Sequence, residues 1–370
     1  MNKTDDLRYM SLALALGRRG FGRVWPNPAV GCVLVAQNRI VGRGWTQDGG
    51  RPHAEVVALA QAGQAAQGAT AYVTLEPCSH TGQTGPCCDA LIAAGIVRVV
   101  VALEDPDPRV SGRGLERLRD AGIEVVTDVL NARAQIDQIG FLRRIEDARP
   151  MVTLKLANSF DGRIATATGQ SQWITGPEAR RSVHMMRARH DAVMVGAGTA
   201  RHDDPSLTVR DLGHDERQPV RVVVSRRLDI PLMGKLAQTA GDSPVWICHG
   251  ADADPQLKDT WGGLGAVLIE CGARGGYLQV SDVLSKLAEK GLTRVFCEGG
   301  GQLAASLLEA DLVDHLVGFT AGLTIGAEGL PSIGALGLND LAAAPRFKLA
   351  HTRAIGGDVL HEWQRSSAAP

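Results

Sequence analysis

Strand and helix patterns alternate along the whole chain, in two series that a polar, helix-like stretch at 131–150 separates. Apolar runs rich in Val, such as 97–103 and 219–225, are typical of buried strands, and helical spacing of apolar residues separates many of them. This alternation predicts an α/β fold, in which helices cover a largely parallel sheet. Because 370 residues exceed one typical domain, we expect two domains, 1–147 and 148–370, with the polar stretch as their connection.

Charge and composition limit the partners of such a chain. The 39 Lys and Arg residues nearly balance the 40 Asp and Glu residues, for a net charge of −1, which disfavours a polyanion such as nucleic acid. No apolar run approaches the roughly 20 residues of a membrane span, and the N-terminus has no signal-peptide pattern. The seven cysteines are an odd number spread along the chain, as in a reduced protein. We therefore expect a cytoplasmic protein with no membrane partner.

The first series contains three potential metal ligands, His53, Cys78 and Cys87. One imidazole and two thiolates suit zinc, and three protein ligands leave a fourth tetrahedral position for water, as in catalytic zinc sites. Glu55 lies two residues from His53, where a carboxylate is suited to move a proton from that water to a leaving nitrogen. Cys88 directly follows Cys87, and neighbouring side chains on a helix point about 100° apart, so we interpret Cys88 as a buried bystander. A structural zinc site is the alternative.

A glycine-rich turn, Glu298-Gly299-Gly300-Gly301, joins a strand to a helix in the second series. Glycines at such a junction allow backbone N–H groups to approach a phosphate. The turn lacks the G-x-G-x-x-G pattern, which disfavours a Rossmann domain. Taken alone, it is equally consistent with a tight turn that binds nothing.

Several segments of the first series resemble the pyrimidine deaminase domain of the bifunctional riboflavin-biosynthesis deaminase/reductases. These segments are PNPAVGCVLV (26–35), HAEVVAL (53–59), TLEPCSHTGQTGPC (74–87) and DPDPRVSGRG (105–114). The H-x-E…P-C pattern is shared with other zinc-dependent deaminases, although here eight residues rather than two separate the two cysteines. The resemblance implies a cytidine-deaminase-like three-layer α/β/α domain in which zinc hydroxide deaminates 2,5-diamino-6-(5-phosphoribosylamino)pyrimidin-4-one. It also implies that Asn27 contacts this substrate, while Thr46 and Asp107 depart from the family pattern and leave their roles open.

Segments of the second series resemble the reductase domain of the same family: 154–176, 196–210 and 297–308. The resemblance implies a dihydrofolate-reductase-like α/β domain that uses NADPH to reduce a ribosyl group to a ribityl chain. By position it assigns to the NADPH site Ala157, Trp173, Thr199, Asp203, Ser225, Gly300, Gly301, Gln302, Leu303, Ala304, Ala305 and Ser306. It assigns to the phosphorylated substrate Ser171, Arg187, Leu207, Arg210 and Glu298. Lys155, in the opening strand of the second series, is a further candidate for the hydride-acceptor end of the site.

Both sets of motifs together predict a bifunctional enzyme with one Zn²⁺ per chain, NADPH, a small phosphorylated pyrimidine substrate and a homo-oligomeric state, dimer or tetramer. Arg226 and Arg227 follow a strand at which a cation would suit the 2′-phosphate of NADPH, although a solvated charged pair fits equally well. A nucleic-acid-editing zinc deaminase with an appended binding domain is an alternative, but only 4% of the residues are aromatic. A zinc-stabilised ligand-binding protein without turnover is another.

Overall fold

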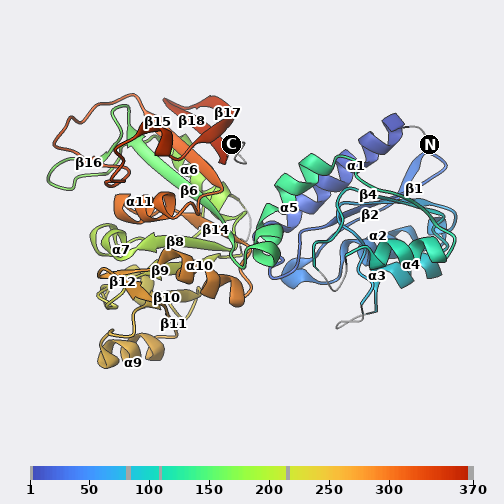
Figure 1. Cartoon of the computed structure of the whole chain (residues 1–370), viewed down its shortest axis with the longest axis horizontal. Helices are drawn as coiled ribbons and strands as arrows, with labels where there is room; N and C mark the ends of the chain where they lie inside the picture. The colour runs from blue at the N-terminus through green and yellow to red at the C-terminus, as the bar shows by residue number, and fades with distance from the viewer. Residues whose placement is uncertain (1–2, 81–84, 108–110, 214–216, 366–370) are drawn as a thin grey trace. The chain divides into compact units, whose positions relative to one another are not determined.

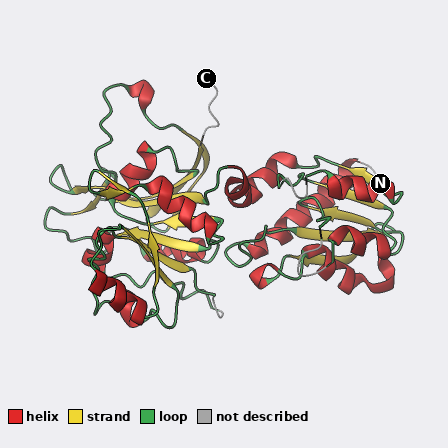
Figure 2. Cartoon of the chain, turned by 60° about the horizontal axis from the view of Figure 1, so that its bottom comes forward, coloured by secondary structure: helices red, strands yellow, loops and turns green. Residues whose placement is uncertain are grey.

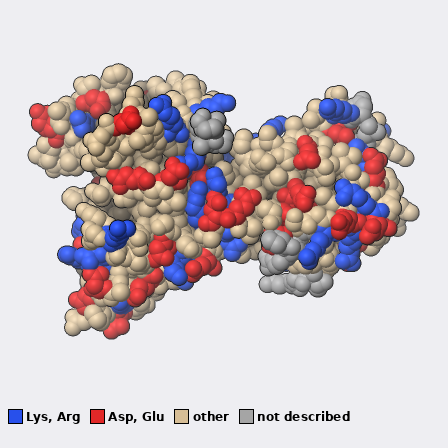
Figure 3. Space-filling view, in the orientation of Figure 1, with Lys and Arg blue, Asp and Glu red and all other residues tan. Residues whose placement is uncertain are grey.

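The computed structural model describes residues 3–80, 85–107, 111–213 and 217–365. It separates into two compact units, Met1–Ala148 (unit 1) and Arg149–Pro370 (unit 2). None of the helices within the described ranges combines the length and the apolar character that crossing a membrane requires. On the face of the molecule shown in Figure 3, basic and acidic side chains are interspersed over both units.

Unit 1 contains a five-stranded sheet formed by β1 (Gly31–Ala36), β2 (Arg39–Trp45), β3 (Thr70–Val73), β4 (Arg98–Val101) and β5 (Glu124–Val126). The strand order is β2-β1-β3-β4-β5, with β1 antiparallel to β2 and β3, and β3, β4 and β5 parallel. The helices are α1 (Lys3–Gly17), α2 (Ala54–Ala62), α3 (Cys87–Ala93), α4 (Arg113–Asp120) and α5 (Asn131–Glu146). Figure 1 shows α1 and α5 on one face of the sheet and α2, α3 and α4 on the other. Unit 1 is therefore a three-layer α/β/α sandwich.

Glycines in β2 allow α2 to lie directly on the sheet. A Cβ atom on Gly44 would lie 2.1 Å from the Ala54 carbonyl oxygen, and one on Gly42 would lie 2.3 Å from that of Ala58. No side chain fits at such a distance, so the helix backbone rests on the strand backbone. This contact fixes the start of α2, and with it His53.

The helix expected to connect the domains is part of unit 1. In α5, Asp137 accepts hydrogen bonds from Arg18 Nε at 2.9 Å, and Gln138 Nε2 donates to the Ala29 carbonyl at 2.8 Å. Phe141 of α5 is buried in the core of unit 1. The helix therefore packs beside α1 within unit 1 and does not form a separate linker between the two domains.

Unit 2 contains a nine-stranded sheet in the order β11-β10-β9-β8-β14-β6-β15-β18-β17. Its strands are β6 (Met151–Ser159), β8 (Ala192–Gly196), β9 (Val220–Val224), β10 (Val245–His249), β11 (Val267–Glu270), β14 (Arg294–Cys297), β15 (His315–Ala321), β17 (Phe347–Ile355) and β18 (Asp358–Arg365). All neighbours pair parallel except β15 with β18 and β18 with β17. Two small pairs lie outside this sheet: β7 (Arg163–Ala165) with β16 (Leu330–Pro331), and β12 (Ala273–Arg274) with β13 (Tyr277–Leu278).

Helices lie on both faces of the large sheet of unit 2 (Figure 2). They are α6 (Pro177–Arg187), α7 (Ala197–Asp203), α8 (Lys235–Gln238), α9 (Pro255–Gly263), α10 (Val280–Glu289) and α11 (Gly301–Glu309). Short 3-10 turns at 18–20, 48–50, 63–66 and 341–343 complete the described helical segments. The α/β architecture predicted from the alternating pattern is confirmed in both units.

Candidate functional site

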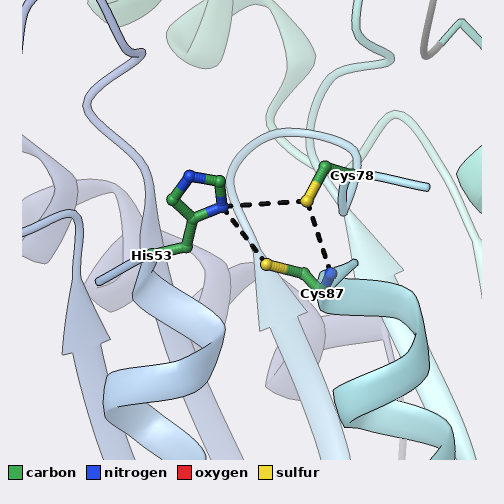
Figure 4. Close-up of side chains that lie close together, drawn as sticks. All are labelled: His53, Cys78 and Cys87. Carbon is green, nitrogen blue, oxygen red and sulfur yellow. Dashed lines mark hydrogen bonds between the residues drawn. The ribbon is translucent and has the colours of Figure 1, made fainter. Parts of the chain in front are cut away.

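His53, Cys78 and Cys87 come together in unit 1. Their Nδ1 and Sγ atoms all lie within 4.8 Å of one another. His53 Nδ1 is 3.3 Å from Cys87 Sγ and 3.7 Å from Cys78 Sγ, and the three side chains point toward one another (Figure 4). Around a tetrahedral zinc ion, sulfur and nitrogen ligands stand about 3.5 to 3.8 Å apart. The donor types and their spacing therefore fit zinc.

Local structure explains why these three atoms meet. His53 is the residue that precedes α2, Cys87 is the first residue of α3, and Cys78 lies in the loop that follows β3. The backbone N–H of Cys87 donates a hydrogen bond to Cys78 Sγ at 3.3 Å. Hydrogen bonds from Cys87 and then from His53 lower the pKa of Cys78 to about 4, which favours the thiolate that binds metal.

Glu55 lies in the first turn of α2, beside the cluster. It is only 4% exposed, and burial raises its pKa to about 7. Cys88, by contrast, donates its thiol to the Pro77 carbonyl at 3.1 Å, away from the three ligand atoms. It is fully buried, as expected for a bystander.

A cavity of about 270 Å³ opens onto the cluster and receives Glu55. Asn27, Thr46, His80 and Asp107 also line it. The Asn27 amide donates to the Gly50 carbonyl at 2.8 Å, which fixes this side chain at the cavity wall. Thr46 is buried, and its hydroxyl donates to the Pro28 carbonyl at 3.0 Å while accepting from the Val30 N–H. Thr46 thus holds the loop that carries Asn27.

Sequence reasoning overlooked Glu76, which shapes another wall of the cavity. Its carboxylate accepts hydrogen bonds from the backbone N–H groups of Gly114 at 2.8 Å, Gly112 at 3.1 Å and Asp105 at 3.2 Å. It therefore ties the segment after β4 to the segment that carries Cys78. A carboxylate two residues before a zinc-ligand cysteine was the available signal. Residues 81–84 and 108–110 of the two motif segments lie outside the described residues.

Other cavity residues had no role assigned from the sequence. Some of them lie within the motif segments: Pro26, Pro28, Val30, Leu75 and Asp105. The others lie outside these segments: Arg51, Phe141, Arg144 and Ile145. Phe141, Arg144 and Ile145 belong to α5, so only the packing of this helix on unit 1 brings them to the site.

In unit 2, three predicted charged residues converge. Arg187 of α6 donates from Nε to Glu298 Oε1 at 2.5 Å and from Nη2 to Oε2 at 3.0 Å. Lys155 Nζ of β6 lies 3.9 Å from Glu298 Oε2. Burial lowers the pKa of Lys155, although the nearby Glu298 opposes that shift. A buried ion pair of this kind orients its groups rigidly.

The glycine-rich turn meets α7 in unit 2. Gly300 has a φ of 69°, and a Cβ on it would lie 3.0 Å from Thr199 Oγ1. Leu303, Ala304 and Ala305 are buried in the core, so their side chains face away from solvent. Gln302 is exposed, and its carbonyl accepts a hydrogen bond from the Ser306 hydroxyl at 3.1 Å. Gly301 opens α11, where backbone N–H groups are available to an anion.

The remaining predicted residues of unit 2 have varied surroundings. Trp173 is 66% exposed, and the Arg180 guanidinium lies 4.4 Å from its ring centre. Ser225 is buried and donates to Asp229. The rest are located as follows: Ala157 in β6, Ser171 half-buried before Trp173, Asp203 at the end of α7, Leu207 buried, Arg210 exposed and bonded to the Ser206 hydroxyl, Arg226 paired with Asp252, and Arg227 exposed.

Two family models match the chain. One, described as the cytidine and deoxycytidylate deaminase zinc-binding region, matches residues 3–103. The other, the RibD C-terminal domain, matches residues 150–361.

Whole-chain relatives extend this match. The chain is 42% identical to the riboflavin biosynthesis protein RibD of Escherichia coli, over 96% of this chain and 99% of that one. It is 40% identical to RibD of Aquifex aeolicus, over 99% and 100% of the two chains.

Solved structures agree. Acinetobacter baumannii RibD aligns with a TM-score of 0.88 at 36% identity, over 99% of this chain and 100% of that chain. A diaminohydroxyphosphoribosylaminopyrimidine deaminase/5-amino-6-(5-phosphoribosylamino)uracil reductase from Thermotoga maritima aligns with a TM-score of 0.85 at 33% identity, over 98% and 99%. The predicted order of a cytidine-deaminase-like domain and a reductase domain is confirmed. The chain belongs to the RibD family of riboflavin biosynthesis proteins, bifunctional enzymes with a deaminase and a reductase domain.

Proposed function

We propose that unit 1 deaminates the phosphoribosylated diaminopyrimidine named for the Thermotoga relative, and that unit 2 then reduces its ribosyl group with NADPH. One observation carries the first half: two thiols and an imidazole of zinc-ligand spacing open onto a cavity that also receives the buried Glu55. The chain contains a zinc-binding domain and a reductase domain, and these two domains use the two cofactors Zn²⁺ and NADPH.

In unit 1, His53, Cys78 and Cys87 hold the zinc ion. A zinc ion held there would lower the pKa of a bound water to near 7 and so supply a nucleophile at neutral pH. Glu55 takes a proton from the attacking water and delivers it to the exocyclic nitrogen, which leaves as ammonia. Asn27, fixed by its bond to the Gly50 carbonyl, orients the pyrimidine in the cavity.

In unit 2, Lys155, Arg187 and Glu298 work as one group. Reduction opens the ribosyl ring: a hydride adds to C1′, the bond between C1′ and the ring oxygen breaks, and a proton adds to that oxygen. Lys155 donates that proton, because burial lowers the pKa of its ammonium group. Glu298, held by Arg187, binds the sugar hydroxyls. The phosphorylated substrate also contacts Ser171, Leu207 and Arg210.

The other predicted residues of unit 2 would hold NADPH. Thr199 and the turn at Gly300 form one part of this site, where the backbone N–H groups at the start of α11 would be available to the phosphates. The full set is Ala157, Trp173, Thr199, Asp203, Ser225 and the run from Gly300 to Ser306. Leu303, Ala304 and Ala305 contribute backbone only, because their side chains are buried.

Residues 1–147 form the deaminase domain and 148–370 the reductase domain in this proposal. The family models, which end at 103 and begin at 150, are consistent with that division. We also propose a cytoplasmic location and a homo-oligomeric state, dimer or tetramer, which light scattering on the purified chain tests.

The test follows both reactions in one vessel. The purified protein receives the diaminopyrimidine substrate with and without NADPH, and ammonia release and NADPH oxidation are measured together. Ammonia appears in both cases, and NADPH is consumed only after deamination. Absence of ammonia release would contradict the assignment of unit 1, and ammonia without NADPH oxidation would contradict that of unit 2.

A further inference from the structure

Four carboxylates of the described part of the chain line the deaminase cavity: Glu55 lies in α2 beside the metal ligands, and the other three, Glu76, Asp105 and Asp107, lie in two segments that are tied together. Asp105 and Asp107 follow β4, and Glu76 ties their segment to the loop that carries Cys78. The arginines that line the cavity among the described residues are Arg51 and Arg144, neither of which belongs to those segments. Both are half-buried.

Arg51 and Arg144 border the same loop, residues 26–30. Arg51 follows Gly50, whose carbonyl accepts the Asn27 amide at 2.8 Å, and a Cβ on Gly50 would lie 2.5 Å from that amide nitrogen. Arg144 belongs to α5, which is bonded to this loop through Gln138 and Ala29 at 2.8 Å. Two segments bonded to the loop that carries Asn27 therefore each contribute an arginine to the cavity: the segment at Gly50 contributes Arg51, and α5 contributes Arg144.

The charges of the cavity determine where the phosphate dianion of a bound substrate can lie. The pyrimidine ring has to approach His53, Cys78 and Cys87, and the phosphate is repelled by Asp105 and Asp107 and attracted by guanidinium groups. Guanidinium also presents planar paired donors that match phosphate oxygens. We propose that Arg51 and Arg144 form the phosphate-binding end of the deaminase cavity. This inference rests on the proposed function of unit 1.

The experiment compares two substrates, the phosphorylated diaminopyrimidine and its dephosphorylated riboside. Arg51→Met and Arg144→Met, made singly in the full chain, each raise KM for the phosphorylated substrate by about tenfold or more, because a charge-assisted contact is lost. Both variants keep the wild-type KM for the riboside and nearly the wild-type kcat. We expect inorganic phosphate to inhibit the wild type competitively and to inhibit the two variants less. Arg51→Lys restores part of the affinity, since it keeps the charge.

Controls separate this inference from folding and from the proposed function. Arg143→Met changes the neighbouring arginine of α5, which pairs with Asp147 directly after this helix, and leaves both KM values unchanged. Zinc content and thermal unfolding of unit 1, followed by circular dichroism, report whether each variant folds. An unchanged KM for the phosphorylated substrate in both variants, or an equal rise for the riboside, overturns the inference. A wild-type protein that releases no ammonia overturns the proposed function instead.

Discussion

At the scale of single residues, Glu55 is the most informative side chain of the deaminase cavity. Its carboxylate is buried, and Glu55 is the second residue of α2, two residues after the ligand His53. Glu55→Gln keeps the shape but cannot carry a proton, so ammonia release falls by about 10² or more. Zinc content, measured by atomic emission, stays at one per chain. Glu116→Gln, an exposed change on α4, is the matched control and leaves the rate unaltered. Undiminished deamination by Glu55→Gln would exclude the proposed proton transfer.

His190, a buried residue of unit 2, makes stability depend on pH. Its Nδ1–H donates to the Met186 carbonyl at 2.7 Å, and Nε2 accepts from the Thr153 hydroxyl at 2.9 Å. Burial, with Arg294 nearby, lowers its pKa from 6.5 to about 3. Below pH 6.5, His190 is therefore protonated in the unfolded chain but stays neutral in the folded chain.

The stability that neutral His190 contributes is present above pH 6.5 and is lost as pH falls toward 3. Between about pH 7 and pH 5 this loss amounts to about 2 kcal/mol. Denaturant unfolding of unit 2, followed by loss of reductase activity, measures it at both pH values. His190→Gln removes this part of the dependence, while His315, whose pKa burial lowers to about 4, keeps its own part; an equal slope in the variant would show that His190 contributes nothing.

The zinc ligands could be predicted from the sequence because His53, Cys78 and Cys87 each stand in a motif with chemical meaning. The proposed roles of Arg51 and Arg144 could not be predicted from the sequence. A single arginine gives no periodic signal, and its place at the cavity depends on how a loop and a distant helix pack. The ion pair between Arg187 and Glu298 could likewise not be predicted, because it forms only when the end of α6 packs near the end of β14.

At the scale of elements, the metal site depends most on the close packing of α2 against β2. Gly44→Ala would drive a Cβ to within 2.1 Å of the Ala54 carbonyl and push the start of α2, with His53, off the sheet. We expect a loss of about 3 kcal/mol or more in the stability of unit 1, together with weaker zinc binding. Thermal unfolding and competition with a zinc chelator measure the two effects. Gly262→Ala, whose Cβ meets open space, is the control; equal behaviour of both variants would refute the argument.

Most central strands could be predicted from apolar runs, and 315–321 coincides with β15. The hairpin of β17 and β18 was missed, because most side chains of β17 are exposed and no apolar alternation marks the strand. The packing of α5 was also missed: its sequence is polar, and few of its residues, Phe141 among them, reach the core.

At the scale of the whole molecule, each unit has its own sheet and core, and the proposed activities are therefore separable. Cys78→Ser removes a zinc ligand from unit 1, so deamination is lost, while reduction of the deaminated product by NADPH persists in unit 2. Chelation of zinc from the wild type has the same effect. Both activities are measured on the same preparation. Loss of both in the folded variant, as judged by circular dichroism, would indicate a single composite site.

The junction between the units is sharply defined. Arg149 donates two hydrogen bonds to Asp314, at 2.7 and 2.8 Å, and Asp314 also accepts the Val152 N–H. The chain is thus anchored in unit 2 directly after the exposed Ala148. An insertion at Ala148 leaves both α5 and β6 intact. A cut or a fusion of the coding sequence at this position would therefore separate or join the two units with the least damage to the fold of either.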